Sequence, residues 1–379
     1  MRAVVYRGVN DLRIETVPVP RISANELLVK VAVCGICPTD IKKIQYGTVP
    51  PPRIFGHETA GTIVKIGGNR TSLVIPSPIG WERVAAGRVR VGDRVALHHH
   101  VPCLDCHFCR HRAFAQCPQY KRTGITAGFE PAGGGFAEYV RVMNFVLPGV
   151  VKIPAKNSFE EGAMLEPVNT VLKAVKRLSI LHGDVVLVAG QGPIGLMFTR
   201  LLQLQGADVV ATDLLESRLR LAKKFGAKWT LLVYSPQSTV GGRRRAMTSG
   251  LATVDWRLKT LDAAVIAVPS DEVVRQALQL VRGGGQVLLF AHTKRSSNLQ
   301  PSTFNLQLSA ICLDEKDIIG SYSSDFTLQG EVARLVFSRR FDVRPLITHR
   351  FPLAETAAAV QLASHPTANS LKIMVTQIG

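Results

Sequence analysis

The stretch VVLVAGQGPIGLMFTRLLQLQGADVVATD, residues 185–213, decides how this chain folds. Its first five residues, 185–189, are apolar and predict a short buried strand. The apolar run after the glycines predicts a helix that ends near Leu204, and a second strand is expected at 207–212. Strand, tight turn, helix and strand in this order predict a βαβ unit, the building block of a parallel sheet.

The turn of this unit carries three glycines with G-x-G-x-x-G spacing, Gly190, Gly192 and Gly195. The first permits the tight turn, the second lets a pyrophosphate approach the backbone, and the third lets the helix pack close to the strand. Pro193 suits the first helical turn, and the helix N-terminus can hold the phosphates. Asp213 closes the second strand, where a carboxylate can accept both ribose hydroxyls. The segment therefore predicts a bound dinucleotide and favours NAD over NADP.

A lone glycine motif is weak support, because glycines also mark helix C-caps and surface loops. Here the strand before it, the helix after it and the acidic residue at the end of the next strand supply the context that the motif requires. Arg218 follows Asp213 closely, but that carboxylate would repel a 2′-phosphate, so the role expected for Arg218 is stacking on adenine. The residues predicted to bind the cofactor are Gly190, Gly192, Pro193, Ile194, Gly195, Asp213 and Arg218.

The length and composition are those of a globular protein with two domains, since 46% of the 379 residues are hydrophobic. No run of about 18 apolar residues appears, and the chain begins with a strand-like alternation rather than a signal peptide. No membrane span and a cytoplasmic location are therefore expected. The net charge of +18 is compatible with nucleic acid as a partner, but the basic residues are scattered. The densest basic cluster, 243–245, has no accompanying nucleic-acid motif, so a solvated surface is favoured.

Four of the seven cysteines lie close together, namely Cys103, Cys106, Cys109 and Cys117. Clustered cysteines in a cytosolic protein indicate metal rather than disulfides. Tetrahedral zinc takes four soft ligands, and this spacing lets one loop surround a closed, structural site. The alternative, four reduced cysteines without metal, would expose several reactive thiols. The nearby histidines are not counted as ligands, because four thiolates already complete the shell: His98, His99, His100, His107 and His111.

A second group of metal-binding side chains is expected in residues 1–66, which are typical of a β-rich, barrel-like region. Between two of its strands lie Cys37 and the pair His57 and Glu58. A thiolate, an imidazole and a carboxylate are ligand types of a catalytic zinc, which keeps one position open. By itself, His57 is more often a hydrogen-bonded loop histidine than a ligand. Cys34 and Cys37 also match a redox C-x-x-C pair, which is disfavoured because no βαβ unit follows closely.

Glu166, directly before Pro167 at the junction to the dinucleotide-binding segment, is a candidate third ligand. It is expected to end a helix that starts with a capping box of Ser158 and Glu161. The alternative is a helix-end carboxylate in solvent, and the residues alone leave both readings open. The irregular segment 69–90 receives no functional assignment.

After residue 213 the alternation of helices and strands continues. The expected helices are 218–225, 271–281 and 328–337, and the expected strands are 262–268, 286–291 and 370–375. Glycines at 283–285 are expected to separate helix from strand, and 318–322 is expected to return to mixed structure. Segment 228–260 stays unassigned.

Taken together, GICPTD, GHE, the four-cysteine lobe, LEP and GQGPIG resemble, in this order, the motifs of zinc-dependent medium-chain dehydrogenases of the alcohol dehydrogenase superfamily. The resemblance covers almost the entire chain and is nearest to the sorbitol and threonine dehydrogenase branch. It implies an α/β fold with a GroES-like, β-rich catalytic domain and a Rossmann domain, a doubly wound parallel sheet that binds the cofactor. The implied domains are a catalytic domain at 1–166 with a zinc lobe at 98–120, a Rossmann domain at 167–321, and a return to the catalytic domain at 322–379. A homodimer or homotetramer is also implied.

By this resemblance, Cys37, His57 and Glu166 match the ligands of the catalytic zinc. Glu58 matches the neighbouring carboxylate that ligates zinc directly or through water, and Thr39 would accept the substrate proton. A glutamate at the third ligand position, where ethanol-type enzymes carry cysteine, places the chain in the polyol branch.

The chain departs from this family at three places. Lys42 stands where many relatives have the histidine that passes the proton to solvent, Pro38 replaces the usual glycine or arginine, and 69–90 is longer than usual. An unperturbed lysine is a poor proton acceptor at neutral pH. We therefore expect Lys42 to be a bystander and the proton to leave through Thr39 and a ribose hydroxyl.

The implied reaction is the reversible oxidation of a secondary alcohol to a ketone by hydride transfer to NAD, with two zinc ions per chain. The substrate would be a polyol, an amino alcohol or a sugar. A function of another class is a zinc-stabilised binding protein that uses the basic surface of a dehydrogenase scaffold. Such a protein would not need Cys37, His57 and Glu166 together, and the same ligand set disfavours a zinc-free quinone reductase.

Overall fold

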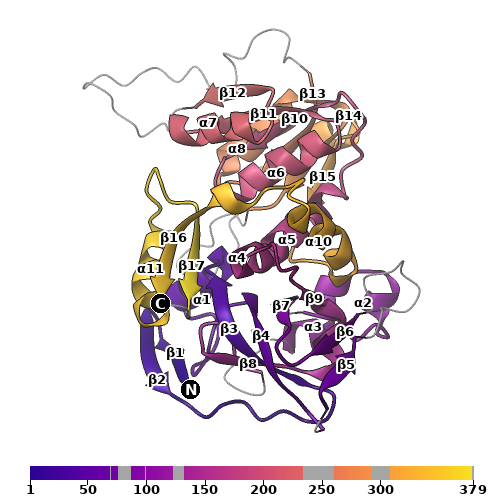
Figure 1. The fold of residues 1–379 in the computed structure, drawn as a ribbon. Helices are drawn as coiled ribbons and strands as arrows, with labels where there is room; N and C mark the ends of the chain where they lie inside the picture. The colour runs from indigo at the N-terminus through magenta and orange to yellow at the C-terminus, as the bar shows by residue number, and fades with distance from the viewer. Residues whose placement is uncertain are drawn as a thin grey trace. The chain divides into compact units, whose positions relative to one another are not determined.

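The computed structural model describes residues 1–68, 70–75, 87–98, 100–122, 132–233, 260–291 and 308–377. The chain forms two compact units (Figure 1). Unit 1 combines Met1–Thr170 with Ser323–Gly379, and unit 2 is Val171–Tyr322. The basic cluster at 243–245, His99 and parts of segments 69–90 and 228–260 lie outside the described residues.

Unit 1 is built on a seven-stranded sheet with the order β16-β17-β3-β4-β7-β9, in which β8 also pairs with β3. Its strands are β3 (Leu27–Gly35), β4 (Glu58–Ile66), β7 (Arg94–Leu97), β8 (Tyr139–Val142), β9 (Val150–Lys152), β16 (Ile347–Pro352) and β17 (Lys372–Thr376). β17 runs antiparallel to β3 with Met374 opposite Gly35, so segments from both ends of the chain share one sheet (Figure 1). The β-rich domain that the sequence predicts is confirmed.

β3 is the central strand of this sheet, because it pairs with β17, β4 and β8. Every residue of β3 except Lys30 is buried. A strand covered on both faces shows such a continuous apolar run instead of an alternating pattern. The pairing of β3 with β4 places Gly35 opposite Glu58, so the end of one strand lies beside the start of the other.

Two small antiparallel sheets complete the strands of unit 1: β1 (Arg2–Gly8) with β2 (Asp11–Thr16), and β5 (Ser72–Val74) with β6 (Arg88–Arg90). The β5–β6 pair lies in the described parts of segment 69–90, which the sequence left unassigned. The helices are α1 (Pro38–Tyr46), α2 (His107–Arg110), α3 (Pro118–Arg122), α4 (Phe159–Ala163), α10 (Gln329–Phe337) and α11 (Thr356–Ser364). Short 3₁₀ helices lie at Phe114–Gln116, Asn144–Gly149, Phe326–Leu328, Arg344–Leu346 and Leu353–Glu355.

The predicted capping box at the start of α4 is confirmed, because Ser158 Oγ accepts from Glu161 N at 3.1 Å and Glu161 Oε2 accepts from Ser158 N at 2.7 Å. The predicted end of this helix at Glu166 and Pro167 is wrong. α4 ends at Ala163, and a new helix, α5 (Leu165–Val175), holds Glu166 in its first turn. Proline is tolerated there because the N–H groups of a first turn have no intrahelical partner to lose.

Unit 2 is a six-stranded parallel sheet with helices between its strands. The strands, in spatial order, are β12 (Trp229–Leu232), β11 (Asp208–Asp213), β10 (Val185–Ala189), β13 (Leu261–Ile266), β14 (Val281–Leu289) and β15 (Asp317–Gly320). Numbered along the chain, this is the order 3-2-1-4-5-6 of dinucleotide-binding sheets. The predicted Rossmann sheet is therefore confirmed.

The helices of unit 2 are α6 (Pro193–Leu204), α7 (Glu216–Lys224), α8 (Asp271–Leu280) and α9 (Leu308–Cys312). Two sequence predictions for this unit are wrong. Glycines 283–285 do not separate helix from strand but lie inside β14, where the pairing with β13 shifts register. Residues 317–320 form β15, so this stretch completes the parallel sheet instead of leaving it.

Each unit has its own apolar core. In unit 2, Leu187 and Val210 from the sheet pack with Val274 and Leu278 from α8, which explains the apolar spacing of that helix. Among the described residues, no helix combines the length and the apolar character needed to cross a bilayer.

Candidate metal and cofactor sites

The Sγ atoms of Cys103, Cys106, Cys109 and Cys117 all lie within 4.8 Å of one another, and we call this set the cysteine group. The Sγ–Sγ separation is 3.5 Å for Cys106 and Cys109, 3.6 Å for Cys103 and Cys117, and 3.9 Å for Cys103 and Cys109. Zinc–sulfur bonds of about 2.3 Å in a tetrahedron require sulfur separations of roughly 3.8 Å. The four cysteines therefore fit a single tetrahedral zinc ion, and none of them forms a disulfide.

Backbone N–H groups already point at these sulfur atoms. Cys106 N donates to Cys103 Sγ at 3.4 Å, and Cys103 N donates to Cys117 Sγ at 3.5 Å. Backbone hydrogen bonds from Asp105 and Cys106 lower the pKa of Cys103 to about 7. Since a thiolate is the form that binds metal, the loop backbone prepares this ligand.

A second set, Cys37, His57 and Glu58, has ligand atoms within 4.8 Å of one another, and we call it the mixed-ligand group. Cys37 is the residue at the N-terminal cap of α1, and Glu58 begins β4. The two segments meet because Gly35, two residues before Cys37, pairs with Glu58 across β3 and β4. Soft sulfur, imidazole nitrogen and carboxylate oxygen form a donor set that fits zinc.

Asp40 is buried beneath this group, and its Oδ2 lies 3.2 Å from His57 Nδ1. Burial raises the pKa of Asp40, but the charge and hydrogen bond of His57 and the charges of Lys43 and Lys372 together outweigh burial, so the net pKa is lowered. A carboxylate at Nδ1 fixes the imidazole tautomer and leaves Nε2 available for metal. No role follows for Asp40 from the sequence pattern alone, although its place three residues after Cys37 on one helix is the signal that could have found it.

Glu58 forms a buried ion pair with Lys372, the first residue of β17. The Lys372 ammonium also donates to the carbonyl oxygen of Ile36 at 2.9 Å. Burial lowers the pKa of Lys372, but the charge and hydrogen bond of Glu58, together with the charges of Cys37 and Glu166, raise it above its usual value. A Cβ on Gly35 would lie 2.0 Å from Glu58 Oε2, so only glycine leaves space for this carboxylate. Lys372 is far from Glu58 in the sequence, so a search for local motifs could not predict this ion pair.

Glu166 is only 6% exposed, so the alternative of a helix-end carboxylate in solvent is wrong. Its carboxylate lies outside the 4.8 Å set of the described mixed-ligand group. Burial raises the pKa of Glu166 to about 7. The charge of His57 opposes this rise, and the charge of Glu58 adds to it. Glu166 is therefore within electrostatic range of His57 and Glu58 in the mixed-ligand group. Thr170 Oγ1 donates to Glu166 Oε1 at 3.4 Å.

Thr39 lies beside the mixed-ligand group, because its Oγ1 donates to Cys37 Sγ at 3.2 Å. Its side chain is half-buried in the first turn of α1. The Thr39 hydroxyl is therefore in direct contact with one of the candidate ligand atoms of the mixed-ligand group. Lys42, on the same helix, is also half-buried.

In unit 2, the glycine loop has the geometry that phosphate binding requires. Gly190 has φ +90°, a left-handed conformation that favours glycine. A Cβ on Gly195 would lie 1.7 Å from the carbonyl oxygen of Gly190, so the helix could not approach with any other residue. Gly192 has open space around its missing Cβ, and Pro193 and Ile194 begin α6 directly after it.

Asp213 closes β11 and is buried beside this loop. Its Oδ2 accepts from Gln191 N at 2.6 Å, and its Oδ1 accepts from Leu215 N at 2.9 Å. Arg218 Nη1 lies 3.8 Å from Asp213 Oδ2. The carboxylate thus fixes the backbone of the glycine loop. Gln191 and Leu215 bind Asp213 through their backbone N–H groups, so a motif made of side-chain types could not identify them.

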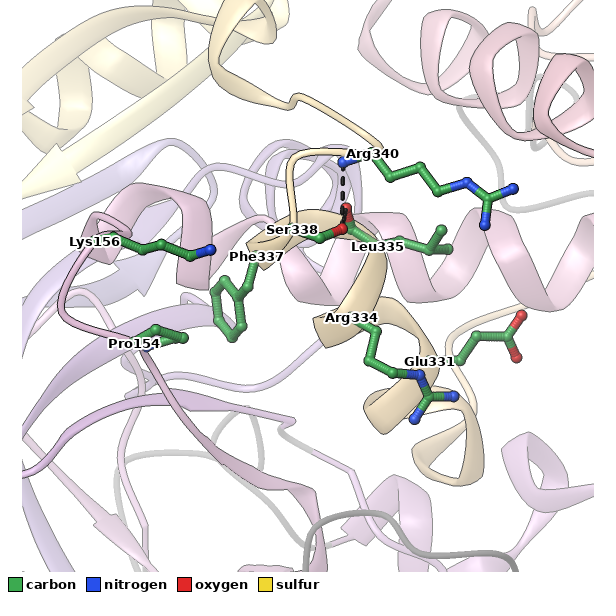
Figure 2. Close-up of a pocket in the computed structure, with 8 residues that line it drawn as sticks. All are labelled: Pro154, Lys156, Glu331, Arg334, Leu335, Phe337, Ser338 and Arg340. Atoms are coloured by element: carbon green, nitrogen blue, oxygen red, sulfur yellow. Dashed lines mark hydrogen bonds between the residues drawn. The ribbon is translucent and has the colours of Figure 1, made fainter.

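A surface hollow of about 580 Å³ lies in unit 1 at the C-terminal end of α10 (Figure 2). Its rim carries Lys156, Arg334 and Arg340 with one acidic residue, Glu331. None of its lining residues belongs to the cysteine group, the mixed-ligand group or the glycine loop. We assign it no role.

Comparison with known proteins identifies the family. Residues 23–155 match the family described as "Alcohol dehydrogenase GroES-like domain", and residues 193–338 match "Zinc-binding dehydrogenase". The chain is 32% identical to a sorbitol dehydrogenase of Bombyx mori over 98% of each chain. It is 28% identical to a probable D-xylulose reductase A of Emericella nidulans, over 91% of this chain and 88% of the relative.

A crystal structure of a putative zinc-binding dehydrogenase from Sinorhizobium meliloti 1021, bound to NADP, has a TM-score of 0.79 and 26% identity. The match covers 99% of this chain and 98% of that one. The chain belongs to the zinc-dependent alcohol dehydrogenase family, in its sorbitol dehydrogenase-like branch. It is an oxidoreductase with zinc and NAD as cofactors that acts on a small-molecule alcohol, and the alternative of a pure binding protein is not favoured.

Proposed function

We propose that this chain oxidises a secondary alcohol of a polyol, amino alcohol or sugar at the mixed-ligand group, with NAD bound at the glycine loop. The observation that supports the site is the convergence of Cys37, His57 and Glu58 in unit 1, with the buried Glu166 in electrostatic range. A pure structural site would not need three different donor types and an additional buried carboxylate.

In this proposal Cys37, His57 and Glu166 hold the catalytic zinc, and Asp40 orients His57. The ion, when bound, lowers the pKa of the alcohol, and NAD supplies the hydride acceptor. Glu58 is the neighbouring carboxylate that ligates directly or through water, and Lys372 fixes its position. Cysteines 103, 106, 109 and 117 hold the structural zinc.

Thr39 accepts the proton of the substrate hydroxyl in this proposal, since its own Oγ1 is already fixed by the 3.2 Å contact with Cys37 Sγ. Lys42 takes no part in the proton path. The cofactor is held by Gly190, Gly192, Pro193, Ile194 and Gly195, with Asp213 on the ribose and Arg218 on the adenine. The buried Asp213 supports NAD as the preferred cofactor.

We also propose domain boundaries at 166/167 and 321/322, a homodimer or homotetramer, and a cytoplasmic location without nucleic acid as a partner. Size-exclusion chromatography with light scattering measures the assembly.

The function is tested with a panel of secondary alcohols and NAD, followed at the absorbance band of reduced nicotinamide, on protein whose zinc content is measured. Oxidation of at least one panel member by wild type is expected. Cys37→Ser should abolish it while retaining the zinc of the cysteine group. Failure to reduce NAD with any alcohol, in protein that holds two zinc ions per chain, would contradict the proposal.

A further inference from the structure

Lys43 shares one face of α1 with two residues that contact the mixed-ligand group. It follows Thr39 by four residues and Asp40 by three, and residues with these spacings share one face of a helix. Thr39 contacts Cys37, and Asp40 contacts His57, so both neighbours of Lys43 on this face contact proposed zinc ligands. Successive helical residues are rotated by about 100°, which turns the adjacent Lys42 away from Asp40.

The ammonium of Lys43 has an aromatic neighbour, and the Asp40 carboxylate is within electrostatic range of it, because the charge of Lys43 helps to lower the pKa of Asp40. Its Nζ lies 5.9 Å from the ring centroid of Phe55, within the range of a weak cation–π contact. Across the part of the chain that the structure describes, no carboxylate forms an ion pair with Lys43. The nearby acidic side chains already have other partners, since Asp40 contacts His57 and Glu58 forms an ion pair with Lys372.

His100 is within electrostatic range of both Lys43 and His57. The imidazole of His100 stacks on Tyr120 at a centroid distance of 4.4 Å. Burial lowers the pKa of His100 well below its usual value, and the charges of His57 and Lys43 lower it further. The charges of His57, a proposed zinc ligand, and of Lys43 therefore both act on the His100 imidazole, which comes from a different segment of the chain. This is consistent with the helical spacing, which puts Lys43 on the same face of α1 as Thr39 and Asp40.

We propose that Lys43 binds a carboxylate on the substrate, so that the preferred substrates are polyhydroxy carboxylic acids and not neutral polyols. This inference rests on the proposed function of the mixed-ligand group. A half-buried ammonium that no described carboxylate contacts as an ion pair gains a charge-assisted hydrogen bond when an anionic group binds. One ammonium matches the single negative charge of a carboxylate, whereas a phosphate ester carries nearly two charges and usually needs more donors.

The test compares hexitols with the hexonates that share their carbon configuration, such as sorbitol with gluconate and mannitol with mannonate. Values of kcat/KM with NAD are measured for zinc-loaded wild type, Lys43→Met, Lys43→Arg and the matched control Lys42→Met. The best hexonate should exceed the best hexitol. Lys43→Met should lower kcat/KM for hexonates by about 10- to 100-fold, the value of a hydrogen bond to a charged group, and change that for hexitols little. Lys43→Arg should restore most of the hexonate activity, and Lys42→Met should leave the hexonate-to-hexitol ratio unchanged.

A second measurement does not depend on turnover. Millimolar gluconate should raise the unfolding temperature of wild type and of Lys42→Met, but not that of Lys43→Met, because a ligand stabilises only the protein that binds it. Preference of wild type for a hexitol or a hexitol phosphate, or an equal loss for acids and neutral polyols in Lys43→Met, would overturn the inference. Those outcomes leave the proposed function intact. Conversely, stabilisation by gluconate that needs Lys43, without oxidation of any alcohol, would support the anion site and contradict the proposed function.

Discussion

The cysteine group and the mixed-ligand group both gather metal-binding side chains, but they do so with different parts of the chain. All ligands of the cysteine group come from one short segment, 103–117, and backbone N–H groups of that segment support the sulfur atoms. The mixed-ligand group joins α1 to the start of β4, and Lys372 braces it from β17. A contiguous site follows from spacing in the sequence, whereas an assembled site depends on the pairing of distant strands.

The largest effect is expected from Cys103→Ser, which removes one ligand from the contiguous site. Structural zinc contributes its binding free energy to folding, so the unfolding temperature should fall by more than about 10 °C and one zinc ion should be lost. Differential scanning calorimetry and elemental analysis measure both. Cys312→Ser, at an exposed cysteine outside both groups, is the matched control. A Cys103→Ser protein with unchanged stability and two zinc ions would show that the cysteine group holds no structural metal.

The second-largest effect is expected from Lys372→Met, which removes the cation that pairs with Glu58 in the mixed-ligand group. Lys372→Met leaves the Glu58 carboxylate buried without its cation, so the free energy of unfolding should fall by about 3–5 kcal/mol. The double variant Lys372→Met with Glu58→Gln should recover part of this loss, because the uncompensated charge is gone. Urea unfolding of the three proteins provides the values. Equal stability of wild type and Lys372→Met would mean that the ion pair does not brace the site.

The next change separates metal holding from proton transfer within the assembled site. Thr39→Ala should lower kcat by about 10²- to 10⁴-fold, the usual contribution of a positioned proton acceptor, with both zinc ions retained. Lys42→Ala should alter the pH profile of kcat little. A large loss in Lys42→Ala that added small amines restore would identify the lysine as the proton relay instead.

A smaller effect is expected from the residue that orients a ligand without binding metal. Asp40→Asn should weaken zinc binding at the mixed-ligand group by about 10- to 100-fold and leave the cysteine group unaffected. Competition with a chelator should then show one weakened and one unchanged site per chain. Asp105→Asn, at an exposed carboxylate beside the cysteine group, is the control. Weakening of both sites in Asp40→Asn would show a general loss of structure.

The smallest effect extends the comparison to the glycine loop, a second contiguous site. Asp213→Ala should shift the ratio of kcat/KM for NADP to that for NAD upwards by roughly tenfold, the value of one hydrogen bond to a charged group. Because Asp213 also accepts from Gln191 N, the unfolding temperature of the variant must be measured alongside. Equal use of both cofactors by wild type would show that Asp213 does not face the ribose.

Contiguous features are the ones that the sequence predicts well. The strand 185–189 and the end of α6 at Leu204 are where the pattern places them, because apolar periodicity and glycine spacing are local signals. β15 was not predicted, because a four-residue strand at a sheet edge has little periodicity of its own. The helix boundary near Glu166 was wrong because proline both ends helices and begins them.

Some features of the candidate sites can be predicted from the sequence, and others depend on the fold. The ligand types and the four-cysteine spacing can be read from the chain, since metal chemistry restricts them. Lys372, Asp40 and the space left by Gly35 depend on which strands become neighbours. Only the three-dimensional arrangement shows that a lysine 314 positions after Glu58 neutralises it.

The pairing of β17 with β3 also has a consequence for protein synthesis. All ligands of the cysteine group leave the ribosome by residue 117, so this segment can take up zinc while most of the chain is still untranslated. Glu58 must wait for residue 372 before its counter-charge exists. The ion pair that holds Glu58 therefore cannot form until translation is nearly complete, whereas the cysteine group has all its side chains much earlier.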